Sequence, residues 1–149
     1  MKALTISQPY ASLIASGAKW VENRRWWTDY RGQLAIHAGK GQQYLSGPEL
    51  QAYPTGCVVA VAKLVGCVRL DNVRRMAKAK PKVRMPGTER YWSEILRHKH
   101  TEGPWCWILE DITPLPEPVQ AKGQVGLWEW RGRGESVHPL SDALFKGER

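Results

Sequence analysis

The sequence predicts a small α+β domain, a β-barrel of five or six strands with two or three flanking helices. Three observations lead to this class. The chain has 149 residues, which suits one compact core and leaves little room for a second. Short apolar segments of strand character recur along it, with segments of helical spacing between them. No apolar run approaches the roughly 20 residues that a membrane helix needs.

The N-terminal segment predicts a strand followed by a helix. Residues 3–6 form the strand, and Pro9 suits the first turn of a helix that runs to about Ser16. Gly17 then supplies the left-handed residue that often ends a helix.

Two further strands are expected within the first forty residues. A short one spans 20–24, and a second spans 33–38. The aromatic segment 26–32 reads as the loop between them. The second strand closes on Gly39-Lys40-Gly41, and a loop with glycines lets a ligand approach the backbone closely.

The middle of the chain predicts a long strand between two short helical segments. Residues 48–53 can make one or two helical turns, and 91–97 a short helix. Between them, 56–70 is apolar and β-branched, and Gly66 interrupts it. Such a glycine predicts a bent or bulged strand that curls into a barrel.

Two strands near the C-terminal end complete the predicted set, at 105–110 and 126–130. We therefore assign one domain to residues 1–130, with a basic loop inserted at about 72–88. Residues 131–149 are polar and glycine-rich, which predicts a loosely packed tail.

The charge of the chain favours an anionic partner. Lys and Arg number 22 against 14 Asp and Glu, which gives a net charge of +8. The predicted basic loop contains no acid, and its prolines favour an extended segment that can lie along a phosphate backbone. The alternative is a solvated loop that only keeps the protein soluble. The cations of this loop are Arg74, Arg75, Lys78, Lys80, Lys82 and Arg84.

The cysteines and histidines give no metal signature, and we predict neither a metal nor a cofactor. Three cysteines without a CxxC pair predict free, buried thiols in a reducing compartment. His98 and His100 with Glu102 lack a further ligand at a recognisable spacing. His37 reads as a hydrogen-bonded histidine at a strand end. The N-terminus reads as a strand and not as a signal peptide, so we expect a cytoplasmic protein without membrane contact.

One charged motif, Gly17-x-Lys19-x-x-Glu22-x-Arg24, follows the predicted helix stop. Strand alternation places Glu22 and Arg24 on one face, so Lys19 must enter from the turn. A desolvated lysine beside an arginine can lose its proton and become a general base or nucleophile. Glu22 opposes this, because a carboxylate stabilises the ammonium. The motif therefore favours a charge-balanced ligand cleft, with a surface salt bridge as the alternative.

The adjacent indoles Trp26 and Trp27 follow Arg24-Arg25 and precede Tyr30-Arg31. Two neighbouring residues of one strand cannot both face one core, so at least one ring should be exposed. An exposed ring beside guanidinium groups suits stacking on an unpaired base. The alternative is a lid that packs over the first helix.

These motifs together resemble the ASCH domain family, a β-barrel family related to the PUA fold. The resemblance covers roughly residues 2–130 and leaves the predicted basic loop unexplained. The N-terminal matches are Gln8-Pro9, the Gly17–Arg24 motif, Tyr30-Arg31-Gly32 and Ile36-His37-Ala38; the later ones are Gly56-Cys57-Val58-Val59, Val65-Gly66-Cys67-Val68, the strand from Trp105, and Lys122-Gly123 before Trp128.

The resemblance implies a nucleic-acid-related role. We expect a monomer that binds RNA or single-stranded nucleic acid in a cleft around the charged motif, with DNA or a nucleoside as alternatives. The basic loop would contact phosphates. Outside that loop, the expected binding residues are Gln8, Lys19, Glu22, Arg24, Arg25, Trp26, Trp27, Tyr30, Arg31 and Lys40.

The competing expectation is a metal-independent enzyme with Lys19 at its centre, assisted by Glu22 and Arg24. One bacterial subgroup of the family hydrolyses the amide of N4-acetylcytidine with a lysine, a threonine three residues later and a glutamate from a later strand. Lys19 matches that lysine, but Glu22 stands at the threonine position. A ribonuclease that uses Lys19 is a second enzymatic alternative, and a protein-interaction module is a third reading.

Overall fold

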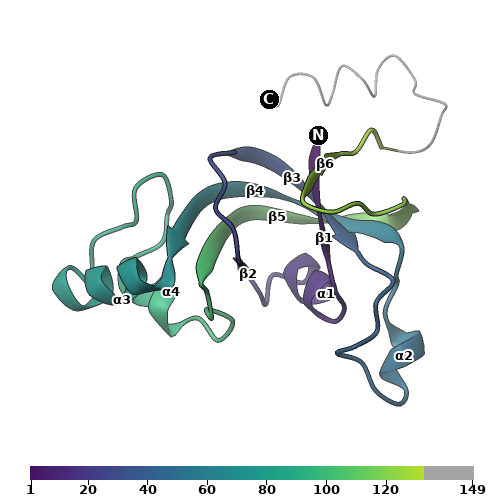
Figure 1. Cartoon of the computed structure of the whole chain (residues 1–149), viewed down its shortest axis with the longest axis horizontal. Coiled ribbons are helices and arrows are strands. Elements are labelled where there is room, and N and C mark those ends of the chain that lie inside the picture. The colour runs from purple at the N-terminus through teal and green to yellow at the C-terminus, as the bar shows by residue number, and fades with distance from the viewer. Residues whose placement is uncertain (133–149) are drawn as a thin grey trace. The chain divides into compact units, whose positions relative to one another are not determined.

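The structure is a computed structural model that describes residues 1–132, so most of the predicted tail, from 133 onward, lies outside the described residues. Figure 1 shows its six strands and four helices. The predicted α+β class is confirmed, with one helix more than expected. The strands are β1 (Lys2–Ile6), β2 (Val21–Arg24), β3 (Gly32–Ala38), β4 (Cys57–Arg69), β5 (Trp105–Gln120) and β6 (Leu127–Glu129). The helices are α1 (Tyr10–Ala15), α2 (Glu49–Ala52), α3 (Leu70–Ala79) and α4 (Trp92–Arg97).

The strands form one mixed sheet in the order β2-β5-β4-β3-β1-β6. β1 and β3 pair in parallel, with Lys2 opposite Leu34. β6 pairs antiparallel with the other edge of β1, and β2 pairs antiparallel with β5. Strands that are distant in sequence are therefore neighbours in the sheet.

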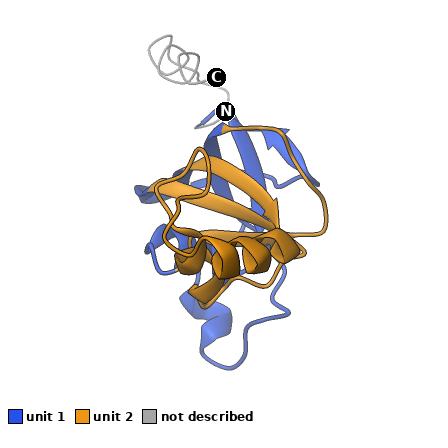
Figure 2. Ribbon diagram, turned by 90° about the vertical axis from the view of Figure 1, so that its left-hand side faces the viewer, with its two compact units in different colours: residues 1–18, 32–62, 112–149 blue, residues 19–31, 63–111 orange. Residues whose placement is uncertain are grey.

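The chain divides into two compact units (Figure 2). Unit 1 comprises residues 1–18, 32–62 and the segment from 112 onward. Unit 2 comprises 19–31 and 63–111. Both β4 and β5 contribute residues to each unit.

Unit 1 has a small core around the first strand. Its helix α1 buries Ala11 and Ile14, three residues apart on one helix face. Gly17 follows with φ +84°, the left-handed conformation predicted for the helix stop. A further cluster of buried side chains comprises Ala3, Ala35, Val58, Trp128 and Trp130.

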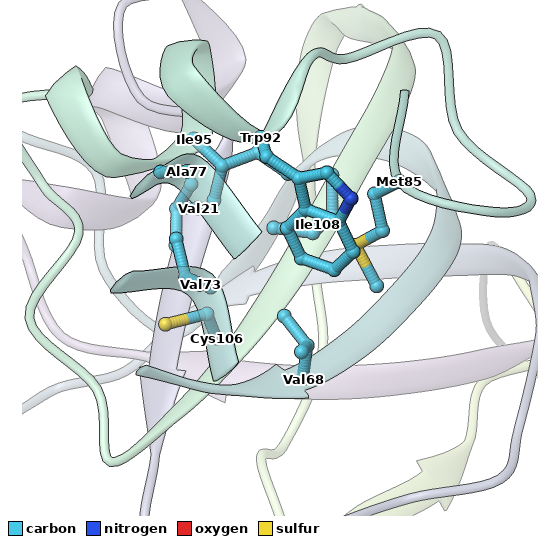
Figure 3. Close-up of a cluster of buried hydrophobic side chains, with 9 residues drawn as sticks. All are labelled: Val21, Val68, Val73, Ala77, Met85, Trp92, Ile95, Cys106 and Ile108. Atoms are coloured by element: carbon cyan, nitrogen blue, oxygen red, sulfur yellow. The ribbon is translucent and has the colours of Figure 1, made fainter. Parts of the chain in front are cut away.

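Unit 2 is held by a second buried cluster, to which two helices and three strands contribute (Figure 3). Ile95 of α4 and Ile108 of β5 are completely buried in it, and α3 packs beside α4. Burial of such a side chain stabilises a fold by roughly 1.5–3 kcal/mol. The buried members are Val21, Val68, Val73, Ala77, Met85, Trp92, Ile95, Cys106 and Ile108.

Two of the predicted boundaries are wrong. The segment expected to be a basic loop from about 72 begins as the helix α3, because Val73 and Ala77 lie one turn apart and bury one face against the cluster. β5 extends to Gln120, well beyond the predicted end at residue 110. Its prolines at 114, 116 and 118 alternate, so the missing N–H groups fall on one edge and the other edge stays able to pair.

Candidate nucleic-acid interface

The three charged residues of the motif lie in unit 2, in β2 and the turn that leads into it. Lys19 comes before the strand and enters from the turn, while Glu22 and Arg24 alternate along it. The Lys19 Nζ donates hydrogen bonds of 2.6 Å to Glu22 Oε1 and to the Val21 carbonyl oxygen. Arg24 Nε lies 3.6 Å from Glu22 Oε2. One carboxylate thus lies between two cations. The contact between Glu22 and Arg24 agrees with the alternation that predicted both on one face.

Burial distinguishes this motif from a surface salt bridge. The exposed fraction is 3% for Lys19 and 7% for Glu22, whereas the side chain of Arg24 is one quarter exposed. A buried ion pair loses much solvation, so its two charges depend on each other. The motif therefore fixes the turn and leaves part of the Arg24 side chain at the surface.

Histidines and an arginine surround Trp20, next to the buried pair. The His98 ring stacks on Trp20 at a centroid distance of 4.2 Å, and the Arg90 guanidinium lies 3.9 Å from the Trp20 ring centroid. The Trp20 backbone N–H donates to His98 Nε2 at 3.3 Å. Burial first, then the charges of His100, Lys19 and Arg90, lower the pKa of His98 to about 4. His98 is thus neutral at physiological pH.

Asn23 contributes three hydrogen bonds that the sequence analysis missed. Its Nδ2 donates to the His100 carbonyl oxygen, and its Oδ1 accepts from the backbone N–H groups of Glu102 and Gly103. The side chain thus ties β2 to the segment 100–103. No local pattern marks this role, because the partners lie almost eighty residues away.

The two adjacent indoles are both exposed, whereas the sequence predicted that at least one of the two rings would be. The exposed fraction is 38% for Trp26 and 53% for Trp27. Trp26 packs edge-on against the completely buried Trp107, with ring centroids 4.8 Å apart. Trp107 Nε1 also donates to the Trp26 carbonyl oxygen at 3.3 Å. Trp26 is therefore fixed by its contact with the buried Trp107, while part of the residue stays exposed beside Trp27.

Tyr30 and Arg31 follow these indoles and belong to a local turn. The Tyr30 N–H donates to Thr28 Oγ1, and Arg31 Nη1 donates to the carbonyl oxygens of Thr28 and Tyr30. Part of the hydrogen-bonding capacity of Arg31 is therefore used within the turn. Arg25, on the other side of the indoles, is exposed.

The basic segment, residues 72–88, presents all six predicted cations to solvent, partly from α3 and partly from the loop after it. Arg74 lies 3.9 Å from Asp71, and Arg84 lies 3.6 Å from Glu89. Arg75 donates to Asn72. Among the described residues, no carboxylate forms an ion pair with the remaining three, which are Lys78, Lys80 and Lys82.

Two residues predicted for the same site, Gln8 and Lys40, lie in unit 1. Gln8 is completely buried and bonds to the backbone N–H of Ser12 and to the Pro54 carbonyl oxygen, which is a structural role. Lys40 is exposed and lines a pocket of about 780 Å³, where none of the other predicted site residues is found. The sequence analysis did not predict this pocket.

The described residues contain neither a cluster of potential metal ligands nor an exposed thiol. No group of three or more His, Cys, Asp or Glu side chains in residues 1–132 is placed to hold a metal ion. All three cysteines are free and buried, as predicted. Burial is the main cause that raises the pKa of each thiol, to about 11 for Cys106. None of the helices in this part of the chain is long and apolar enough to span a membrane.

Comparison with known proteins identifies the family to which the chain is similar. Residues 4–115 match the ASCH domain. The mouse protein Activating signal cointegrator 1 is 37% identical over an alignment that covers 44% of this chain and 14% of the mouse protein. The human protein of that name is 36% identical over the same shares. The chain thus spans about one seventh of the length of these curated relatives.

Solved structures confirm the predicted fold. The crystal structure of ASCH from Zymomonas mobilis aligns with 99% of this chain and 95% of its own, at a TM-score of 0.52 and 14% identity. A single-residue mutant of that protein aligns with 98% of this chain and 96% of its own, at a TM-score of 0.53 and 16% identity. This likeness supports the ASCH fold, which is PUA-like.

Proposed function

Because the chain belongs to the ASCH domain family, and because its unit 2 combines exposed indoles with exposed cations, we propose that it binds single-stranded RNA. In this proposal Trp26 and Trp27 stack on unpaired bases, and the basic segment contacts phosphates. All the residues involved belong to unit 2.

The observation that carries the proposal is the exposed aromatic pair beside two arginines. Base stacking on an aromatic ring is tolerant of sequence, because every base has a π-face. Trp26 is anchored against Trp107, so little conformational freedom is lost when a base stacks on it. Arg24 and Arg25 directly precede the rings and add positive charge there.

The basic segment supplies the second interaction of the proposed binding, which is contact with phosphates. Phosphate contacts by Lys and Arg release counterions, which makes affinity fall as salt rises. Lys78, Lys80 and Lys82 are the best candidates, since they form no ion pair within residues 1–132. Their side chains can engage phosphates without breaking an ion pair to a described carboxylate.

The geometry gives less support to a hydrolase that uses Lys19. A general base or nucleophile must be a free amine within reach of its substrate. The Lys19 Nζ instead donates two short hydrogen bonds and is almost completely buried. These contacts favour a role in positioning β2 and Arg24. Incubation with RNA and with N4-acetylcytidine tests the alternative, because turnover that Lys19→Ala abolishes would establish it.

Fluorescence anisotropy with a labelled single-stranded RNA tests the proposal. We expect binding at about 50 mM salt that weakens strongly towards 200 mM. Trp27→Ala should cost about 1–3 kcal/mol of binding free energy, the range for one stacked base. Changing Lys78, Lys80 and Lys82 to Gln together should reduce the slope of log K against log salt by about 2. A duplex of the same sequence should bind less tightly, because its bases are already stacked.

A matched control is available in unit 1. Tyr44 is 56% exposed, much like Trp27, and lies outside the proposed interface. Tyr44→Ala should leave RNA affinity unchanged. The proposal fails if no RNA binds at low salt, or if Tyr44→Ala weakens binding as much as Trp27→Ala does.

A further inference from the structure

The pocket in unit 1 is a second feature with the properties of a binding site. Its volume of about 780 Å³ lies within the roughly 300–1,000 Å³ of small-molecule sites. Thr5 of β1 and His37 of β3 contribute to its wall, and both lie near the ends of these parallel, paired strands. The segment 120–125 forms another wall.

Hydrogen bonds fix the orientation of His37 in the wall of this pocket. His37 is 2% exposed, and its Nε2 lies 2.7 Å from the Ala121 carbonyl oxygen. Since a carbonyl only accepts, Nε2 carries the hydrogen. The His37 Nδ1 lies 3.2 Å from Thr5 Oγ1, and Trp128 Nε1 donates a hydrogen bond to the same hydroxyl oxygen. The imidazole is thus held in a single orientation.

Glycines let the backbone close around these groups. A Cβ on Gly123 would lie 2.7 Å from His37 Cε1 and 2.9 Å from Thr5 Oγ1, closer than real side chains allow. A Cβ on Gly56 would lie 2.8 Å from Cε of Lys40, so the lysine stem runs against the backbone there. The pocket is therefore largely preformed, which lowers the cost of ordering on binding.

Charge selects the class of ligand. Lys40 and Lys122 line the pocket and are exposed, and no Asp or Glu is among the lining residues. Neither lysine forms an ion pair with a carboxylate in the part of the chain that the structure describes. Two lysines suit a phosphate monoester, whose charge at neutral pH is about −1.5 to −2.

Thr5, His37, Gln120 and Gln124 are the other polar lining residues, and the remainder of the lining is apolar. Val125 is 99% exposed and so gains no packing within the described chain. With Ala121 and the glycines at 39, 56 and 123, it offers apolar contact to the body of a ligand. An inorganic anion would leave this surface uncovered, whereas an organic phosphate would cover it.

We propose that this pocket binds a small organic phosphate of about nucleotide size, with its phosphate at Lys40 and Lys122 and its apolar body against Val125 and the glycine wall. The site lies entirely within unit 1 and does not depend on RNA binding by unit 2.

Isothermal titration of the full chain with cytidine monophosphate, cytidine and inorganic phosphate tests this proposal. The monophosphate should bind at least about tenfold more tightly than cytidine or inorganic phosphate. Cytidine lacks the phosphate that the lysines would contact, and inorganic phosphate lacks the body that the apolar lining would contact. Lys40→Gln and Lys122→Gln should each weaken binding of the monophosphate about tenfold, the effect of one charge-assisted hydrogen bond. Lys63→Gln is the matched control, because Lys63 is exposed but lies in unit 2.

Amide chemical shifts locate the ligand independently. Cytidine monophosphate should perturb the amides of Gly39, Gly56 and Gly123 and the ring protons of His37, while Trp27→Ala should not alter its affinity. The proposal is overturned if no heat and no shift appear at millimolar ligand, if cytidine binds as well as its monophosphate, or if Lys63→Gln weakens binding equally. RNA binding that survives both pocket variants would leave the function of unit 2 intact.

Discussion

The two units bury polar side chains in different ways. Unit 1 buries Gln8, a neutral amide that donates and accepts within its own unit. Unit 2 buries Lys19 with Glu22, an ion pair in which a single carboxylate contacts two cations. Removing one amide leaves unsatisfied hydrogen bonds, whereas removing one charge leaves its buried partner without a counter-charge. Unit 2 should therefore be more sensitive than unit 1 to the substitution of a single buried polar residue.

Glu22→Ala should have the largest effect on stability. The change removes the carboxylate that the buried Lys19 ammonium contacts at 2.6 Å, and losing one half of a buried pair costs about 3–5 kcal/mol. The free energy of unfolding in urea measures this loss. Replacing both partners, as Lys19→Met with Glu22→Leu, should restore much of it, because apolar side chains of similar volume need no counter-charge.

The control for this prediction is Glu129, which contacts the Lys2 Nζ at 2.9 Å and the N-terminal ammonium at 3.4 Å. The side chains of Lys2 and Glu129 are 37% and 46% exposed. Glu129→Ala should cost only about 0–1 kcal/mol, because solvent screens such a pair. Equal losses for Glu22→Ala and Glu129→Ala would show that burial of the pair has no energetic consequence.

Gln8→Ala should have an intermediate effect on stability, because the hydrogen bonds that it removes join uncharged groups. It removes hydrogen bonds of 2.7 Å to the Pro54 carbonyl oxygen and 2.9 Å from the Ser12 N–H, at a cost of about 1–3 kcal/mol. Urea unfolding measures the loss, which should not vary between pH 5 and 8. Gln43→Ala serves as control, since Gln43 is exposed with one weak bond to Ser7 and should change stability by less than about 0.5 kcal/mol. A loss with Gln43→Ala as large as that with Gln8→Ala would contradict the comparison.

The smallest expected effect is a pH dependence from His98. Its pKa is about 4 in the folded chain against an ordinary 6.5, so between these values the unfolded chain binds more protons. Stability should therefore fall as pH drops from 6.5 towards 4, by roughly 1–2 kcal/mol after screening by solvent. Urea unfolding across this range measures the fall. His98→Gln should flatten the curve, and an unchanged slope would contradict this assignment.

Local patterns predicted much of the candidate interface. Alternation along one short strand was enough to place Glu22 and Arg24 on one face, and two adjacent indoles implied an exposed ring. The helix α3 was missed because Val73 and Ala77 are its only buried side chains. Two apolar positions among many charged residues are too few to predict a helix from their spacing. The charge pattern thus predicted that the cations of this segment are exposed, but it did not predict the helical backbone.

The pocket could not be predicted from the sequence, because residues that are distant in the chain come together to form it. Lys122-Gly123 matched a family motif, yet nothing in that pair reveals that Gly123 faces the ring of His37. The two positions come together only because the chain returns to β3 after β5. A glycine that permits close approach looks like any other glycine until its neighbour is known.

The position of β1 in the sheet has a consequence for the order of folding. β1 lies between β3 and β6, and its partner Leu127–Glu129 comes from the opposite end of the described chain. During synthesis, one edge of β1 must therefore keep its N–H and C=O groups unpaired until nearly all of that chain has been made. Closing so distant a pair is slow, so the nascent protein exposes a strand edge open to other chains. The pairing of β1 is complete only once residues 127–129 have been made.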